Sequence, residues 1–266
     1  MSHGAHPRCM PNETVNGSCA VAQDGKRNVD LFSDVDRSGV LSEEVAYFGE
    51  TKGFLARPND KAVHPAVVMI HEWWGLNDNI KDMAVLLSKE GFVVLAVDLY
   101  EGEVANSSDD ARRLTAGVKQ ERANENMRSA VKYLRERNDV REDSMGSMGW
   151  CFGGGQSLQL ALSGEALQAT VIYYGKVSDD KEQLSRIKWP ILGIFAGNDL
   201  GIPPSSVNAF KASLDELSVK NDITIYPNVD HAFANPSGAR YAPNETKDAW
   251  NKTVKFLHEV LDGQKE

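Results

Sequence analysis

The segment GWCFGGG, residues 149–155, places Cys151 between glycines where an apolar run ends and a helical pattern begins. The pattern Gly-x-Cys-x-Gly is typical of a nucleophile elbow, a sharp strand-to-helix turn whose flanking glycines avoid steric clashes. The N-terminus of the following helix favours a thiolate, and the backbone N–H of Phe152 is placed to hold an oxyanion. The alternatives are a structural cysteine and a phosphate-binding loop, but the latter requires a Lys-Ser/Thr pair that is missing here.

An elbow nucleophile requires an acid and then a histidine later in the chain. Asp199 and His231 each follow a predicted strand. Asp222 precedes its strand, and Asp230 adjoins His231, so neither is as well placed to face the imidazole. The order Cys151, Asp199, His231 therefore predicts a catalytic triad.

Short apolar runs alternate with helical patterns along most of the chain. Such runs are typical of strands buried on both faces, and helices between them indicate an α/β fold with a parallel sheet. The expected strands are 45–48, 51–56, 66–70, 93–97, 145–150, 171–174, 191–195 and 223–226, and the expected helices are 79–89, 109–118, 121–137, 154–163, 206–217 and 246–261. Ligands of such sheets bind at the carboxyl ends of the strands, which is where the three triad residues are predicted.

The loop after the first buried strand reads HEWWG, residues 71–75. It begins like the zinc motif H-E-x-x-H, but its fifth residue is Gly75 and it does not lie on a helix, so neither a metal nor a cofactor is expected. In an elbow hydrolase this loop supplies the second oxyanion donor, here the backbone N–H of Trp73. Trp73 and Trp74 are either an apolar wall of the site or core residues. Glu72 is unexpected, because a carboxylate beside a reactive thiol opposes its ionisation.

Together, these motifs resemble the dienelactone hydrolase family. The matching pieces are 71–77, 98–100, 149–154, 197–199 and 231–233, within a match from about 45 to 261. The resemblance implies an α/β-hydrolase fold over residues 45–266, with helices on both faces of a mostly parallel sheet. It also implies a hydrolase of carboxylic esters or lactones that works through a thioester on Cys151, with Asp199 orienting His231. Glu72 would act as a gate, keeping the thiol neutral until substrate displaces the carboxylate, which then takes the thiol proton.

The sequence departs from the family where its dienelactone enzymes clamp a substrate carboxylate with two arginines. Those positions are Gly102 and Asn235, which cannot pair with a carboxylate, and Arg240 or Arg113 is the candidate substitute. A neutral lactone or small ester is therefore expected, in a pocket that includes Trp73, Trp74, Tyr100 and Phe233. The alternative is a non-catalytic α/β-hydrolase-like binding protein, which the complete triad disfavours.

Residues 1–44 are polar and without periodicity, and we expect an N-terminal extension there. A disulfide between Cys9 and Cys19 would indicate an exported mature form, whereas free thiols would fit the cytoplasm as the default. Residues 34–39 begin like a calcium loop, but Val45 occupies the position that requires a bidentate Glu. An Asp/Ser turn is favoured there.

The net charge of the 266 residues is -9, which argues against nucleic acids and anionic membranes as partners. No apolar run approaches the roughly 20 residues of a membrane helix, and no signal-peptide pattern is visible at Met1. The expected partner is a small-molecule substrate. The sequence leaves open whether the protein is a monomer or a dimer.

Overall fold

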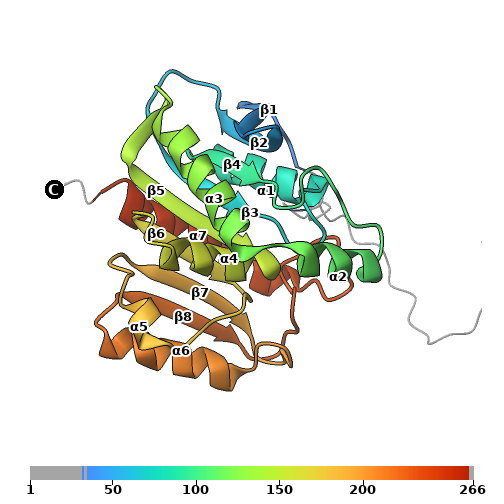
Figure 1. Ribbon diagram of the computed structural model, residues 1–266, viewed down its shortest axis with the longest axis vertical. Coiled ribbons are helices and arrows are strands. Elements are labelled where there is room, and N and C mark those ends of the chain that lie inside the picture. The colour runs from blue at the N-terminus through green and yellow to red at the C-terminus, as the bar shows by residue number, and fades with distance from the viewer. Residues whose placement is uncertain (1–31, 33–34, 264–266) are drawn as a thin grey trace, which may run out of the picture.

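The computed structural model describes residue 32 and residues 35–263, which build one eight-stranded sheet between two layers of helices (Figure 1). The strands are β1 (Val40–Phe48), β2 (Thr51–Pro58), β3 (His64–Ile70), β4 (Val93–Val97), β5 (Val140–Trp150), β6 (Ala169–Tyr173), β7 (Ile191–Ala196) and β8 (Asn221–Tyr226). Their order across the sheet is β1-β2-β4-β3-β5-β6-β7-β8. The pairs β1–β2 and β2–β4 are antiparallel and all other pairs are parallel, so the mostly parallel sheet that was predicted is confirmed.

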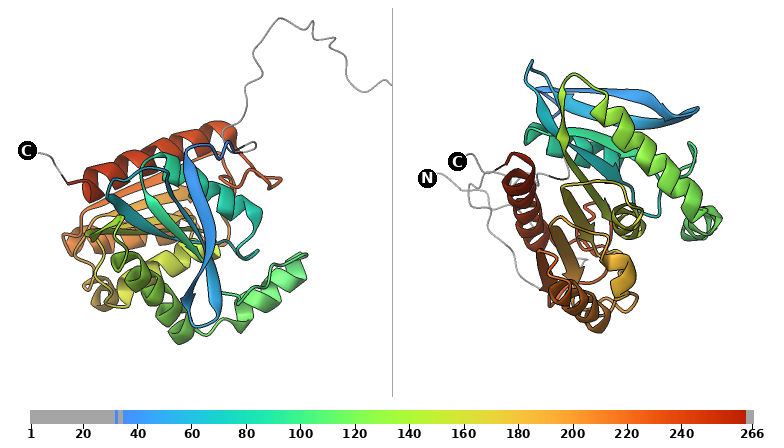
Figure 2. Two further views of the ribbon diagram at one scale, coloured as in Figure 1. Left: turned by 90° about the horizontal axis from the view of Figure 1, so that it is seen from above. Right: turned by 60° about the vertical axis from the view of Figure 1, so that its left-hand side comes forward.

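Helices cover both faces of the sheet, as Figure 2 shows from two further directions. One layer holds α1 (Asp78–Lys89) and α7 (Pro243–Leu261), and the other holds α3 (Gln120–Arg135), α4 (Phe152–Leu162), α5 (Lys181–Leu184) and α6 (Pro204–Glu216). A further helix, α2 (Ser108–Gly117), projects beyond the sheet on the right of Figure 1. None of the described helices is long and apolar enough to cross a membrane.

The alternation of side chains along each strand explains the two layers. In β3, Met69 packs into the core on the α1 and α7 side, whereas Val68 and Ile70 pack into the core on the α3 side. Helix α1 shows the matching helical pattern, with Ile80, Met83, Ala84 and Leu87 all buried. Its first turn is capped by Asn77, whose side chain accepts a hydrogen bond from the backbone N–H of Ile80.

All of the expected strands and helices are present, with ends shifted by a few residues. β1 begins at Val40 rather than at Val45, so the sheet extends into the range predicted as a polar extension. The one-turn helix α5 was not predicted. In the predicted Asp/Ser turn, Asp36 accepts hydrogen bonds from the backbone and hydroxyl of Ser38 and from Lys89. Cys9, Cys19 and Asp34 lie outside the described residues.

The parallel arrangement fixes where the predicted functional loops meet. The strands β3, β5, β7 and β8 run in the same direction, so their carboxyl ends share one edge of the sheet. The segments that follow these ends contain Glu72, Cys151, Asp199 and His231. Residues far apart in the chain are therefore brought to the same edge.

Candidate active site

Cys151 stands in the sharp turn between β5 and α4. Its backbone has φ 55 and ψ -117, a left-handed conformation that is strained for a residue with a side chain. The backbone N–H of Cys151 donates to the carbonyl of Tyr173 at 3.0 Å, which ties the turn to β6.

The elbow requires glycine on both sides of Cys151, as predicted, because a Cβ at these positions would lie too close to neighbouring atoms. A Cβ on Gly149 would lie 2.3 Å from the carbonyl oxygen of Gly153, and one on Gly153 would lie 2.3 Å from the carbonyl oxygen of Ile70. Both contacts are with backbone atoms, which cannot rotate away as the end of a side chain can. The turn therefore packs directly against the end of β3.

The structure brings together the three residues predicted as a triad. The Nδ1 of His231 donates to Asp199 Oδ2 at 2.6 Å, and its Nε2 lies 3.1 Å from the Sγ of Cys151. Asp222 and Asp230, the rival acids, are exposed and do not contact the imidazole. The imidazole can take a proton from the thiol while the carboxylate fixes its orientation.

The electrostatics of this chain of contacts favour a charged imidazole. Burial alone would raise the pKa of Asp199, but hydrogen bonds from His231 and from the backbone N–H groups of Ile202 and Gly201 lower it. Burial opposes a charge on His231, yet its hydrogen bonds to Asp199 and Cys151 raise its pKa to about 10. A proton taken from the thiol is therefore well held on this ring.

Glu72 is buried next to this chain of contacts, but its partner is not the thiol. The side-chain amide of Asn235 donates to Glu72 Oε2, and Glu72 Oε1 has no hydrogen-bond partner among the described residues. Burial raises the pKa of Glu72 to about 7, against the lowering effects of His231, Asn235 and Tyr174. The expected contact between carboxylate and thiol is thus replaced by the contacts of Glu72 with Asn235 and of Cys151 with His231.

A cavity of about 610 Å³ opens over the sulfur of Cys151. Trp73 and Phe152, the two predicted oxyanion donors, are among its lining residues, as is His231. The remaining walls come from α2, the start of α3, α4, and the loops after β6 and β7: Arg112, Thr115, Ala116, Gln120, Gly155, Gln156, Leu158, Gln159, Lys176, Val177, Ser178 and Ile202. The lining is mostly apolar with a few polar side chains, which suits a small organic molecule.

Comparison with known proteins gives the family. The model of the dienelactone hydrolase family matches residues 51–261. The chain belongs to the dienelactone hydrolase family. A relative from Saccharolobus solfataricus, provisionally named carboxymethylenebutenolidase, is 31% identical over 83% of this chain and 99% of its own. A relative from Bradyrhizobium, provisionally named 2-oxo-3-(5-oxofuran-2-ylidene)propanoate lactonase, is 29% identical over 82% of this chain and 93% of its own.

Solved structures agree on the fold. A crystal structure of a protein from Klebsiella pneumoniae, provisionally named a dienelactone hydrolase, has a TM-score of 0.76 at 21% identity. It covers 83% of this chain and 99% of its own. The α/β-hydrolase fold predicted from the sequence is therefore confirmed.

Four residues predicted to bind substrate in this dienelactone hydrolase family member do not line the cavity: Trp74, Tyr100, Phe233 and Arg240. Trp74 packs on Trp73, with ring centroids 5.1 Å apart. Phe233 is fully buried in the core between aromatic rings, and Arg240 is exposed on the surface. The structure does not place these four side chains at the cavity, because proximity to a motif in the sequence does not determine where a side chain points.

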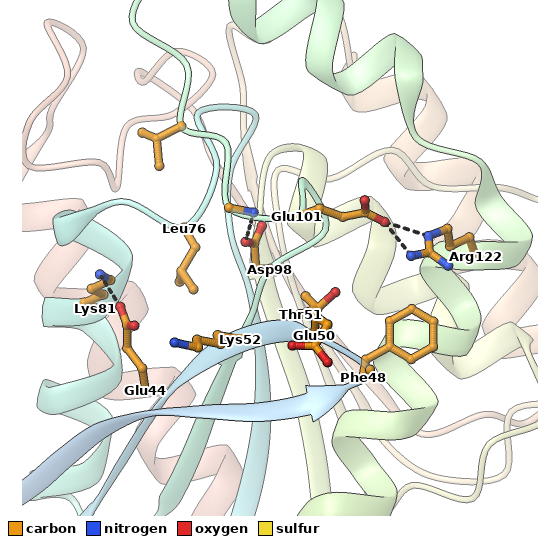
Figure 3. Close-up of a pocket in the computed structure, with 13 residues that line it drawn as sticks. Glu44, Phe48, Glu50, Thr51, Lys52, Leu76, Lys81, Asp98, Glu101 and Arg122 are labelled. Carbon is orange, nitrogen blue, oxygen red and sulfur yellow. Dashed lines mark hydrogen bonds and ion pairs between the residues drawn. The ribbon is translucent and has the colours of Figure 1, made fainter.

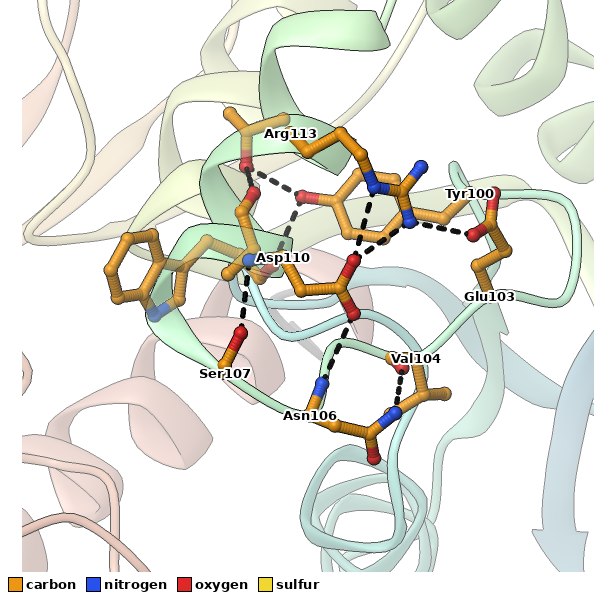
Figure 4. Close-up of polar contacts among 10 residues, drawn as sticks. Tyr100, Glu103, Val104, Asn106, Ser107, Asp110 and Arg113 are labelled. Carbon is orange, nitrogen blue, oxygen red and sulfur yellow. Dashed lines mark hydrogen bonds and ion pairs between the residues drawn. The ribbon is translucent and has the colours of Figure 1, made fainter.

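Tyr100 does not line the cavity but contacts two residues that do, Trp73 and Thr115. Its hydroxyl lies 3.2 Å from the carbonyl of Trp73 and 2.9 Å from the hydroxyl of Thr115, so it joins α2 to the loop after β3. Figure 4 shows the neighbouring contacts of Arg113 with Glu103 and Asp110. Arg113 is therefore paired within the protein and, like Arg240, does not line the cavity.

The sequence did not single out the two cations that do line the cavity. Arg112 lies on α2, and Lys176 lies in the loop after β6. Lys176 could have been found by the rule that identified Asp199, since it also follows a strand at the carboxyl edge. No sequence signal distinguishes Arg112 from its neighbour Arg113.

His71 has a structural role. Its Nδ1 lies 2.6 Å from the carbonyl of Glu72, and its Nε2 accepts the backbone N–H of Leu99 at 3.1 Å. The first contact stays within the loop after β3, and the second holds that loop against the loop after β4. Among the described residues, no cluster of three or more His, Cys, Asp or Glu side chains is arranged to hold a metal ion.

A larger cavity of about 800 Å³ lies beside the β1–β2 hairpin and does not include Cys151 (Figure 3). Four of its charged side chains form pairs: Lys81 lies 3.8 Å from Glu44, and Arg122 lies 2.6 Å from Glu101. Asp98 accepts the backbone N–H groups of Tyr100 and Gly102. The cavity over Cys151 is the better candidate site, because it is the one that contains the cysteine and the imidazole.

Proposed function

We propose that this protein hydrolyses carboxylic esters or lactones, with Cys151 as the nucleophile and a thioester as the intermediate. The observation that supports this most directly is the chain of contacts from Asp199 through His231 to the Cys151 sulfur, at the base of an open cavity. The name of the relative from Bradyrhizobium, a lactonase, agrees with this class of reaction.

In the acylation step, His231 Nε2 takes the proton of the thiol while the sulfur attacks the carbonyl carbon. A C–S bond forms, and the electron pair of the carbonyl moves onto its oxygen. His231 then gives the proton to the leaving oxygen as the C–O bond breaks, which leaves a thioester on Cys151. This assignment gives the proton to His231 and not to Glu72, because the sulfur contacts the imidazole.

In the deacylation step, His231 takes a proton from water, and the resulting hydroxide attacks the thioester carbon. The C–S bond breaks, the acid leaves and the sulfur regains a proton. In both steps the negative oxygen is held by backbone N–H groups, for which Phe152 and Trp73 are our candidates. Phe152 is the first residue of α4, where a backbone N–H has no acceptor within the helix.

Hydrolysis of p-nitrophenyl acetate tests the proposal. We expect Cys151→Ala to lower kcat/KM by about 10³-fold or more, because the nucleophile is lost. The matched control is the double variant Cys9→Ser, Cys19→Ser, which should keep the wild-type rate. Equal rates for the wild type and Cys151→Ala would contradict the proposal and favour the alternative of a non-catalytic binding protein.

The charge of the cavity leads us to propose a preference among substrates. Arg112 and Lys176 line it, whereas no Asp or Glu of the described chain does, in a protein with a net charge of -9. Lys176 has no ion-pair partner among the described residues, and Arg112 contacts only Asp109 on its own helix. These cations favour esters with a negatively charged group at some distance from the scissile bond. The sequence had predicted a neutral substrate instead, because Gly102 and Asn235 replace the two arginines.

Two aryl esters that differ in charge test this preference. We expect Lys176→Ala to lower kcat/KM for the p-nitrophenyl monoester of succinate by about tenfold, because this ester has a free carboxylate that Lys176 attracts. The uncharged p-nitrophenyl butyrate has no such group, so its kcat/KM should change by less than about twofold. Lys188 is exposed and does not line the cavity, so Lys188→Ala is the matched control. An equal loss for both esters would show that Lys176 does not recognise charge.

A further inference from the structure

The buried carboxylate of Glu72 and the thiol of Cys151 both lie close enough to Tyr174 to act on its hydroxyl. Burial raises the pKa of Tyr174 well above its ordinary value, and the nearby charges of Glu72 and Cys151 raise it further. The ring of Tyr174 also contacts His231, with centroids 5.2 Å apart. Glu72 is only 3% exposed, so the hydrogen bonds of its carboxylate come from the protein rather than from solvent.

The side chain of Asn235 sets where this carboxylate lies. Its Oδ1 accepts the backbone N–H of Ser237 at 2.9 Å and the hydroxyl of Ser237 at 2.7 Å. A backbone N–H can only donate, so this oxygen must face Ser237 and the Nδ2 group must face Glu72. The amide therefore presents a donor, in a fixed orientation, to Glu72 Oε2.

The backbone of Asn235 is equally well fixed. Its N–H donates to the carbonyl of Ala232 at 3.1 Å, in the turn that carries His231. Asn235 is only 6% exposed, so little solvent competes for the bond to Glu72. The same turn thus holds the imidazole against the sulfur and the amide against the carboxylate.

From these contacts we infer that Asn235 is a positioning residue that holds the Glu72 carboxylate away from the Cys151 sulfur, so that the free protein keeps its thiol paired with His231. The inference rests on the proposed role of Cys151 as the nucleophile. A carboxylate that turned toward the sulfur would accept the S–H hydrogen bond and oppose formation of the thiolate. Without the amide, Glu72 Oε2 would lack a donor, as Oε1 already does among the described residues, and a buried carboxylate with no donor on either oxygen would be expected to turn toward the S–H group.

The test measures the rate at which iodoacetamide alkylates Cys151 in the full chain as a function of pH. Mass spectrometry of the Cys151 peptide separates this thiol from Cys9 and Cys19. We expect Asn235→Ala to move the midpoint of the pH profile upward by about one unit, which is about a tenfold slower reaction at a fixed pH below the midpoint. In a Glu72→Gln background the same change should leave the midpoint unmoved, because no carboxylate is there to turn.

Two controls separate positioning from a general structural role. Ser237→Ala removes one contact with Asn235 Oδ1 but keeps the backbone N–H that fixes the amide, so the profile should stay unchanged. Glu72→Gln alone should move the midpoint by only a few tenths of a unit, because the carboxylate already lies away from the sulfur. Glu72→Gln alone therefore tests whether the carboxylate lies away from the sulfur, even if Asn235→Ala does not fold.

Three results would overturn the inference: no shift in Asn235→Ala, an equal shift in the Glu72→Gln background, or a downward shift of about one unit in Glu72→Gln alone. Alkylation does not require hydrolysis. If Cys151→Ala still cleaves esters, the proposed function fails, while the alkylation profiles still report whether Asn235 positions Glu72.

Discussion

Replacing His231 with alanine is expected to lower kcat/KM for p-nitrophenyl acetate by about 10³-fold or more, with little change in stability. The imidazole is the group within 3.1 Å of the sulfur, so its loss removes both the base that takes the thiol proton and the acid that protonates the leaving oxygen. The side chain is 27% exposed, and its truncation therefore opens only a shallow space beside the cavity. Steady-state hydrolysis and thermal unfolding of the same preparation measure the two quantities.

The neighbouring acid provides the matched control. Asp230 is exposed and makes no contact with the ring, so Asp230→Ala should hydrolyse the ester at the wild-type rate. Asp199→Asn should lower the rate strongly, because the amide can present a donor where the Nδ1–H of His231 requires an acceptor. If Asp230→Ala lost activity and Asp199→Asn did not, the assignment of the acid would be wrong.

A methyl group added at Gly153 is expected to lower the free energy of unfolding by about 3 kcal/mol and to abolish hydrolysis. A Cβ there would lie 2.3 Å from the carbonyl oxygen of Ile70 and 2.4 Å from that of His71. Only a displacement of the backbone can relieve these contacts, and it would move the start of α4 away from the loop that carries Trp73. Urea unfolding gives the free energy, and the ester assay gives the rate.

Gly155 lies two residues further along the same helix and is the control for this substitution. The nearest heavy atom to a Cβ at Gly155 is the backbone nitrogen of Lys176 at 3.4 Å, an ordinary contact. In addition, alanine is favoured over glycine inside a helix by up to about 1 kcal/mol. Gly155→Ala should therefore be as stable as the wild type or slightly more stable. Equal destabilisation by the two substitutions would mean that the tight packing of the elbow on β3 is not the cause.

The secondary structure was largely predictable because its strongest signals are local. Runs such as 66–70 and 93–97 are apolar throughout because both faces of the central strands are covered. β1 was predicted too short, since most of its first residues are exposed and it is defined by backbone pairing with β2 rather than by burial. The four residues of α5 are too few to show helical periodicity.

The sequence by itself determined the α/β fold, the elbow at Cys151, and the set of Cys151, Asp199 and His231 at one edge of the sheet. These follow from local patterns and from one geometric rule, that parallel strands end on the same side. Only the tertiary structure decided that Arg112 and Lys176 line the cavity, that Tyr100 and Phe233 do not, and that Glu72 is held by Asn235. The reason is physical: chain order fixes which loops meet, but the direction of each side chain depends on hydrogen bonds and packing with residues that are distant in the sequence.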